Sequence, residues 1–226
     1  MTHPTPPTLF FAGTDTDVGK TYVASLIAAA LVGSGQRVGV YKPVASDCRD
    51  EGGQRVAADA VSLWEAAGRP LTIDDVCPQR FIAPLSPPAA AAAEGKAVDA
   101  ERLRSGADRW GDDFDVRIVE GAGGLFSPLA DGLLNIDLVK QFESPRLLIV
   151  AADRLGVIHQ VRATCEGGKQ QGVTASGIIL CQPTPEVDDS VQSNRAEIER
   201  YCDVPVIGSV GYGQTTWPNP DQLLKL

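Results

Sequence analysis

The chain has 226 residues, and its 29 acidic side chains outnumber its 20 basic ones, for a formal net charge of −9. This length suits one large domain with a substantial core, and the negative charge argues against general binding to nucleic acid or to an anionic membrane. The five cysteines are scattered without a C-x-x-C pair, which favours reduced thiols over a disulfide framework or a zinc site. Because the sequence has no apolar run of transmembrane length, and residues 1–8 lack the features of a signal peptide, we expect a cytoplasmic protein.

The stretch 8–21, TLFFAGTDTDVGKT, predicts a phosphate-binding loop between a buried strand and a helix. An apolar strand at 9–11 ends at Gly13, and an alanine-rich helix is expected over 22–32. The backbone N–H groups of such a loop and the N-terminus of the helix converge on an anion. The usual pattern is G-x-x-x-x-G-K-[ST], and this chain departs from it because Thr14 occupies the first glycine position.

Two side chains of this loop have predicted roles. Lys20 would reach the terminal phosphates of a nucleotide, and the Thr21 hydroxyl would bind Mg²⁺. A turn followed by a helix start is the alternative for a lone GKT. The apolar strand before it and the long helix after it favour nucleotide binding.

The second predicted strand, 37–41, ends immediately before Lys42 and leads into a loop that carries Ser46. In an open parallel sheet the carboxyl edge is where ligands bind, so both side chains are candidates for a site. A solvated loop lysine is the alternative for Lys42. Residues 47–55 are polar and contain glycine, which predicts a flexible loop.

The segment that follows predicts helices separated by irregular structure. A helix is expected over 56–67, with an apolar face made of Val56, Ala60, Leu63, Trp64 and Ala67. Asp59 lies off this face near the helix start, where the helix dipole favours an acid even without a ligand. Prolines predict mostly irregular structure over 68–88, followed by one or two helical turns at 89–94 and a helix over 99–110.

A third predicted strand, 116–119, ends in Glu120 and then in a glycine-rich turn, 121–124. A carboxylate at the end of a buried strand is costly to desolvate unless it is paired or bound to a metal. The glycines behind it would let a ligand approach the backbone closely. A plain glycine-rich turn is the alternative, but it does not account for the acid at Glu120.

The rest of the chain alternates strands with helices. Strands are expected at 146–152, 175–181 and 204–210, and helices at 156–167 and 190–201. Near-continuous apolar strands that alternate with helices predict a mostly parallel sheet with helices on both faces. Since the sequence shows no linker and no internal repeat, we expect one α/β domain over residues 1–226, with a P-loop NTPase-like fold.

Three sequence features fall at the same predicted edge of this sheet: the GKT loop, the loop that begins at Lys42, and the strand end at Glu120. Thr21, Asp59 and Glu120 would supply three oxygen ligands for Mg²⁺, which prefers hard oxygen donors together with nucleotide phosphates. Lys20 and Lys42 would place two positive charges around a transferring phosphoryl group.

Several motifs occur together over most of residues 1–160. They are GTDTDVGKT (13–21), YKPVAS (41–46), the acid of ADAVSL (Asp59), FIAPLSPPAAA (81–91), VEGAGGLFSPL (119–129) and, more weakly, RLGVIH (154–159). In its order and spacing this combination resembles the dethiobiotin synthetase family of biotin biosynthesis.

The resemblance implies an ATP- and Mg²⁺-dependent ligase that forms C–N bonds. In that family CO₂, supplied as CO₂ or bicarbonate, adds to one amine of 7,8-diaminononanoate to give a carbamate. The γ-phosphoryl group of ATP then activates the carbamate as a carbamic-phosphoric anhydride, and the neighbouring amine closes the ureido ring of dethiobiotin and releases phosphate. The resemblance also implies a homodimer, with no nucleic-acid or membrane partner.

The same resemblance assigns site residues. It implies that Lys42, Lys20 and Thr16 are catalytic, that Ser46, Thr16 and Lys42 contact the diamine or its carbamate, and that Thr21, Asp59 and Glu120 bind the metal. The residues that it implies for the nucleotide and its metal are Asp17, Val18, Gly19, Lys20, Thr21, Tyr22, Asp59, Glu120, Gly121, Ala122, Gly123, Cys181 and Gln182.

The chain departs from the family pattern at positions that surround this reactive centre. Asp17 stands where a Glu is common, and Cys181 and Gln182 stand where the family often has residues that read adenine. His159 stands where an Asn is often found, and no Tyr occurs in 185–198, two places that bear on the carboxylate end of the substrate across the dimer. The sequence therefore leaves open whether another nucleotide can replace ATP.

Two other functions remain open from the sequence. One is a related ligase of the same fold that acts on another diamine or carboxylate, which the altered specificity positions would suit. The other is a partitioning-type ATPase. Proteins of that kind usually carry a second lysine in the phosphate loop and a basic segment for DNA or membrane. Here no lysine precedes Lys20 in the loop, and the end of the chain, TTWPNPDQLLKL, is neither basic nor long.

Overall fold

The central strands are short apolar runs that the fold buries on both faces. In the computed structural model, which describes residues 6–226, every residue of β1 (Thr8–Gly13) is buried, and nearly every residue of β8 (Arg146–Ala152) and β9 (Gly177–Cys181) is buried too. Such runs are typical of parallel sheets covered by helices on both sides. Residues 1–5, which make up most of the stretch considered for a signal peptide, lie outside the described residues.

The six main strands form one sheet in the order β10-β9-β8-β1-β5-β2, and every neighbouring pair is parallel. The three strands not yet introduced are β2 (Val38–Tyr41), β5 (Val116–Gly124) and β10 (Val206–Val210). β1 lies between β5 and β8, so the loop that follows β1 emerges near the middle of the sheet. The predicted mostly parallel α/β fold is therefore confirmed.

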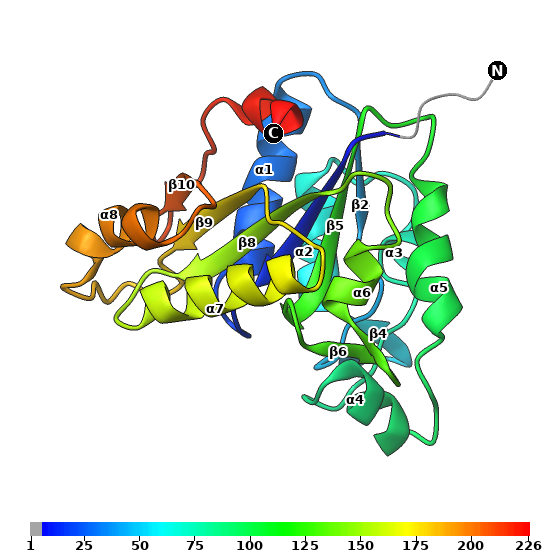
Figure 1. Ribbon diagram of the computed structural model, residues 1–226. Coiled ribbons are helices and arrows are strands. Elements are labelled where there is room, and N and C mark those ends of the chain that lie inside the picture. Colours follow the sequence, from blue (N-terminus) through cyan, green and yellow to red (C-terminus); the bar gives the residue numbers. More distant parts are fainter. Residues whose placement is uncertain (1–5) are drawn as a thin grey trace.

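Helices cover both faces of this sheet (Figure 1). In the view of Figure 1, α7 and α6 lie in front of the strands and α1 lies behind them. The helical elements are α1 (Lys20–Gly33), α2 (Ala58–Ala66), α3 (Ile73–Val76), α4 (Pro87–Ala93), α5 (Ala100–Ser105), η1 (Gly106–Arg109), α6 (Asn135–Val139), α7 (Val157–Gln170), α8 (Val191–Tyr201) and η2 (Pro220–Lys225). Among these helices, none combines the length and the apolar character that a membrane crossing requires.

The polar segment 47–55 is not a flexible loop but forms most of a β-hairpin. β3 (Arg49–Glu51) and β4 (Gln54–Val56) pair in antiparallel register around Gly52 and Gly53, which both have positive φ. A two-residue turn with positive φ at both positions matches the twist of a hairpin. Val56 therefore belongs to this hairpin and not to the following helix, which begins at Ala58. The hairpin was missed because its strands are largely exposed and carry no apolar alternation.

Two more segments contain structure that the prolines and glycines concealed. Within the predicted irregular stretch, Thr72 and Asp75 form a capping box that starts α3, a signal that the sequence did contain. After the glycine-rich motif, a second hairpin of β6 (Pro128–Ala130) and β7 (Leu133–Leu134) leads into α6. The helix predicted over 99–110 is divided into α5 and η1.

One buried core extends under the whole sheet, from β1 and α1 to α8 and η2. We propose on this basis that the chain forms a single domain. Arg117 is one of the buried charged residues: its guanidinium donates to Thr8 Oγ1 at 2.7 and 3.1 Å and to the Ala107 carbonyl at 3.1 Å. Burial lowers the pKa of Arg117 to about 10. These bonds join the amino ends of β1 and β5.

Replacing Thr8 with Val tests this junction, because valine keeps the shape of threonine but removes the acceptor. We expect the free energy of unfolding to fall by about 1–3 kcal/mol, since a buried charged donor loses a partner. Urea denaturation followed by circular dichroism would measure the change. An unchanged midpoint and slope would show that the buried guanidinium does not depend on this hydroxyl.

Candidate nucleotide and substrate site

The phosphate-binding loop is shaped by two close approaches of its backbone. Gly19, which caps α1, has a φ of 84°, and a Cβ at this position would lie 2.4 Å from Cys181 Sγ. At Gly13 an added Cβ would lie 2.4 Å from the carbonyl oxygen of Asp15. Gly13 therefore provides the tight approach one residue before the usual first glycine, so Thr14 does not disturb the loop.

Lys20 is the first residue of α1 and lines the cleft, although its side chain is largely buried. Burial is the main reason why the pKa of Lys20 lies below its ordinary value. Among residues 6–226, no carboxylate lies within ion-pair distance of its ammonium group. An unpaired, partly desolvated cation at a helix N-terminus is well suited to an anion such as a nucleotide phosphate.

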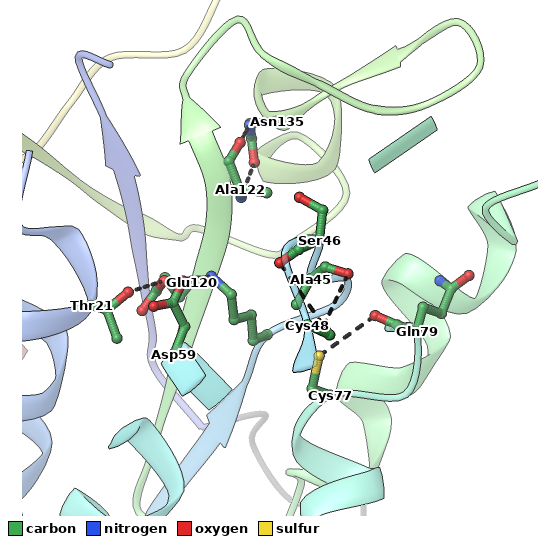
Figure 2. A network of polar contacts seen from close by, with 11 residues as sticks. Thr21, Ala45, Ser46, Cys48, Asp59, Cys77, Gln79, Glu120, Ala122 and Asn135 are labelled. Atoms are coloured by element: carbon green, nitrogen blue, oxygen red, sulfur yellow. Dashed lines mark hydrogen bonds and ion pairs between the residues drawn. The ribbon is translucent and has the colours of Figure 1, made fainter. Parts of the chain in front are cut away.

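Two strands and two helix starts bring four polar side chains into one network (Figure 2). Lys42 Nζ lies 2.6 Å from Glu120 Oε1 and 3.2 Å from Asp59 Oδ2, and the Thr21 hydroxyl donates to Glu120 Oε1 at 2.8 Å. Lys42 follows β2, Glu120 lies within β5, Asp59 is in the first turn of α2, and Thr21 is in the first turn of α1. The structure thus brings together the four residues that the sequence placed at this edge.

The two charged partners set the ionisation of Lys42. Burial by itself lowers the pKa of this lysine, but the carboxylates of Glu120 and Asp59 outweigh that effect and raise the pKa above its ordinary value. Lys42 in turn holds the pKa of Asp59 below its usual range. The alternative of a solvated loop lysine does not describe Lys42, which is only 3% exposed. Asp59 does lie in the first turn of α2, where the helix dipole favours an acid, and it also forms an ion pair with Lys42.

Glu120 has the features of a residue with a further ligand. It is fully buried, within β5 rather than after it, and its Oε2 atom has no hydrogen-bond partner within residues 6–226. A buried, unpartnered carboxylate oxygen is costly unless something else binds it. With the Thr21 hydroxyl and the partly exposed Asp59 carboxylate nearby, the donor set consists of hard oxygens, which fits Mg²⁺.

Among the described residues, no group of three or more His, Cys, Asp or Glu side chains is placed so that it could hold a metal ion by itself. The protein therefore provides two carboxylates and one hydroxyl here, and phosphate oxygens and water would complete the coordination of a magnesium ion.

The loop that carries Lys42 is held by a neighbouring segment and is not free in solvent. The Lys42 N–H donates to the Val76 carbonyl at 2.8 Å, and the Ala45 N–H donates to the Gln79 carbonyl at 2.9 Å. The side chain of Lys42 is therefore presented from a fixed backbone. Ser46 also lines the cleft, and it lies between Ala45 and Asp47, whose N–H groups both donate to this neighbouring segment.

An open cleft of about 810 Å³ connects these groups. The residues predicted for the site that line it are Thr16, Asp17, Gly19, Lys20, Thr21, Tyr22, Lys42, Ser46, Asp59, Ala122 and Gly123. The Tyr22 hydroxyl also donates to the carbonyl of Gln214, which joins the first turn of α1 to the segment after β10.

Five predicted residues do not line the cleft, and one of them is Glu120, whose side chain is fully buried. Val18 and Cys181 have buried side chains, Gly121 lies inside β5, and Gln182 directly precedes Pro183, which does line the cleft. Since the Cys181 thiol packs beneath Gly19, a contact between that thiol and the nucleotide base is not supported; the thiol supports the phosphate-binding loop instead.

The cleft also includes residues that reasoning from the sequence did not assign. They are Ala45, Asp47, Ala57, Ala58, Pro84, Leu85, Ser86, Pro87, Ser127, Pro128 and Pro183. Those from Pro84 to Pro87 belong to the quoted FIAPLSPPAAA motif, so that motif was a usable signal. The sequence also offered no reason to consider Asn135. In the structure its side chain is fully buried and hydrogen-bonds to the backbone of Ala122.

Comparisons with known proteins identify the family of this chain. The family model AAA_26, described as an AAA domain, matches residues 7–218. The ATP-dependent dethiobiotin synthetase BioD of Rhodopirellula baltica is 49% identical over 211 residues, which cover 89% of this chain and 82% of that protein. The proteins of the same name from Idiomarina loihiensis and Bacillus subtilis are each 36% identical, over 91% and 88% of this chain and 92% and 84% of theirs.

Solved structures of similar fold include the signal recognition particle receptor FtsY from Elizabethkingia anophelis, with 16% identity, and chloroplast FtsY from Physcomitrella patens, with 17% identity; both have a TM-score of 0.55. The matches cover 97% and 99% of this chain but only 64% and 65% of the receptors. At such low identity they show the fold alone. The high identity to the synthetases, over most of both chains, shows that this chain belongs to the ATP-dependent dethiobiotin synthetase family.

Proposed function

We propose that this protein carboxylates 7,8-diaminononanoate and closes the ureido ring of dethiobiotin at the expense of ATP. The observation that carries the proposal is the position of Lys42, which is buried against Glu120 and Asp59 in the same cleft as the unpaired Lys20. Two fixed positive charges in one cleft suit a reaction in which a carbamate oxygen attacks a phosphoryl group.

The steps require little covalent chemistry from the protein. One amine adds to CO₂ and loses a proton to give a carbamate, whose oxygen attacks the γ-phosphorus of ATP and displaces ADP. The second amine then attacks the carbamate carbon, the C–O bond to the phosphate breaks, and phosphate and a proton leave. Catalysis of this kind depends on positioning and on stabilisation of negative charge.

In this scheme different residues of the cleft bind the phosphates, the carbamate and the diamine. Lys20, at the start of α1, binds the terminal phosphates, and Lys42 stabilises the carbamate and the transferring phosphoryl group. Thr16 and Ser46 carry hydroxyl groups on the cleft wall and would hold the diamine or its carbamate. The backbone of Gly19 and the first turn of α1 would bind the phosphates through their N–H groups.

Mg²⁺ is proposed as the metal, held by Thr21, Asp59 and Glu120. When bound it would neutralise part of the phosphate charge and so favour attack by the carbamate. The unpartnered Oε2 atom of Glu120 is the feature that supports this assignment. For the nucleotide base we propose contacts near Gln182 and Pro183.

We further propose that the protein is a cytoplasmic homodimer. The segment 154–159 would help to bind the carboxylate end of the substrate in the partner subunit, as the resemblance implies. Leu155 in this segment is 79% exposed and lines the same surface hollow as Ile158 and His159, so this face is open to a partner subunit.

The proposed function is tested by phosphate release with ATP, Mg²⁺ and bicarbonate, measured with and without 7,8-diaminononanoate. We expect release that depends on the diamine, together with a ureido product identified by mass spectrometry. CTP and GTP tested beside ATP would define the base preference. Phosphate release that the diamine does not change would contradict the proposal and favour a ligase for another substrate or a nucleotide switch.

Replacing Lys42 with Ala should lower kcat by about 10²- to 10³-fold, the usual effect of removing a group that stabilises transition-state charge. We expect the Kd for ATP to change little, because Lys20 and the loop backbone bind the nucleotide. Steady-state kinetics and titration with a fluorescent ATP analogue would measure the two effects.

Because Lys42 balances a buried carboxylate, its loss could also unfold the protein, at about 3–5 kcal/mol for a broken buried pair. Lys42→Arg is therefore the matched variant. It keeps the charge, and hence the fold as seen by circular dichroism, but it does not reproduce the position of a lysine ammonium group. A folded Arg variant with nearly normal kcat would remove Lys42 from the proposed mechanism.

Replacing Asp59 with Asn should raise the Mg²⁺ concentration needed for half-maximal rate by about tenfold or more, since even indirect partners of a metal are worth 10- to 100-fold in affinity. Glu65→Gln, on the same helix but paired with Arg69 at the surface, is the control and should leave this concentration unchanged. Equal magnesium dependence in the Asp59 variant and the control would make Asp59 an ordinary acid at a helix start.

A further inference from the structure

The glycine-rich part of β5 departs from the regular ladder next to the site. Phe11 of β1 pairs with Glu120, and Gly13 pairs with Gly124, so Ala12 alone faces the three residues 121–123. Extra residues in one strand form a bulge, which leaves backbone groups without ladder partners and redirects the chain. Here the bulge follows Glu120 directly, and two of its residues line the cleft.

The side chain of Asn135 supplies the partners that this bulge lacks. Its Oδ1 accepts from the Ala122 N–H at 3.2 Å, and its Nδ2 donates to the Ala122 carbonyl at 2.7 Å (Figure 2). The carboxamide therefore pairs with Ala122 as the peptide group of a neighbouring strand would. Nδ2 also lies 2.8 Å from the Gly124 carbonyl and 3.2 Å from the Ser127 carbonyl.

The surroundings of Asn135 fix it in this position. It is fully buried as the first residue of α6, and its own N–H donates to the Ser127 carbonyl at 3.0 Å. On the opposite side, a Cβ added to Gly121 would lie 2.2 Å from Oδ1 of Asn135. Gly121 therefore leaves the space that the carboxamide fills. This close approach explains why position 121 is a glycine even though it does not line the cleft.

We propose that Asn135 is a positioning residue for the reaction. By holding the bulge, it orients the Glu120 carboxylate toward Thr21 and Lys42, and it sets the backbone of Ala122 and Gly123 on the cleft wall. Asn135 is not among the residues that line the cleft, so it would act through Glu120 and the bulge. This inference rests on the proposed function for its kinetic consequences, but its effect on nucleotide binding stands apart from that function.

Two variants of Asn135 test the proposal. Asn135→Asp keeps the shape and the acceptor for the Ala122 N–H but loses the donated bonds and places oxygen against carbonyl oxygens. Asn135→Ala removes all four contacts. We expect kcat to fall by about 10- to 100-fold, as small displacements of reacting groups do, with less change in KM for the diamine. Mg²⁺ should also tighten the binding of a fluorescent ATP analogue less than in the unaltered protein.

Thr8→Val is the matched control for a loss of stability. It removes two buried hydrogen bonds from the same pair of strands, but at their amino ends, far along β1 and β5 from the cleft. All variants would be assayed below their thermal midpoints, determined by circular dichroism. If the Asn135 variants have the kcat and the magnesium effect of Thr8→Val, Asn135 is structural only and the proposal is overturned.

A double-mutant cycle adds a second measurement of the same contact. Gly121→Ala alone should lower kcat much as Asn135→Ala does, because the new methyl group displaces the carboxamide. Added to Asn135→Ala, it should cost little more, since the methyl group then enters vacated space; contacting residues are expected to be non-additive. Additive losses would contradict the coupling.

The two hypotheses fail in different ways. If the unaltered protein shows no diamine-dependent turnover, the proposed function fails, whereas the binding experiment still tests Asn135. If the unaltered protein shows diamine-dependent turnover but the magnesium effect on nucleotide binding is the same in Asn135→Asp and in Thr8→Val, the positioning role of Asn135 fails and the proposed function stands.

Discussion

The salt bridge between Lys42 and Glu120 is the interaction on which the cleft depends. Lys42 follows β2 and Glu120 lies within β5, so the pair forms only when these strands lie side by side in register. Thr21 and Asp59 bond to the same two side chains and thereby fix the first turns of α1 and α2. A buried ion pair is by itself weak evidence for stability, but removing one partner leaves an uncompensated charge in the interior and strongly destabilises the fold. Fold and site are therefore linked at this point.

Charge is distributed unevenly in this acidic protein. Its net charge of −9 would repel a nucleotide at long range, yet the cleft presents two desolvated lysines of different kinds. Lys42 is already balanced by carboxylates, whereas the described residues give Lys20 no ion-pair partner. The phosphates of a nucleotide would thus meet Lys20, which needs a counter-charge, and Lys42, which is already held in place by its carboxylate partners. The two lysines can therefore take different roles: Lys20 binds a phosphate, while Lys42 keeps its position in the ion pair with Glu120.

The sheet, the phosphate-binding loop and the main site residues were predictable because their signals are local. Apolar runs mark the strands, and GKT marks the loop. The polar hairpin at 47–55 gave no such signal, since its strands bury little. Glu120 was placed after a strand, because glycines normally end strands, and only the pairing with β1 shows the bulge. The roles of Cys181 and Asn135 depend on contacts with residues distant in the sequence, which no spacing of residue types reveals.

β5 is secured at both ends, by Arg117 against Thr8 and by Asn135 against the bulge. The number of residues between these two points sets the distance from the amino edge of the sheet to Glu120. An inserted or deleted residue there would turn Glu120 to the opposite face, because side chains alternate along a strand. The turn at Gly52 and Gly53 is different: an added Cβ would meet nothing within 4 Å at either glycine. Space around that turn is therefore open, although the positive φ of both glycines strains any other residue there, whereas a change of chain length in β5 would displace Glu120.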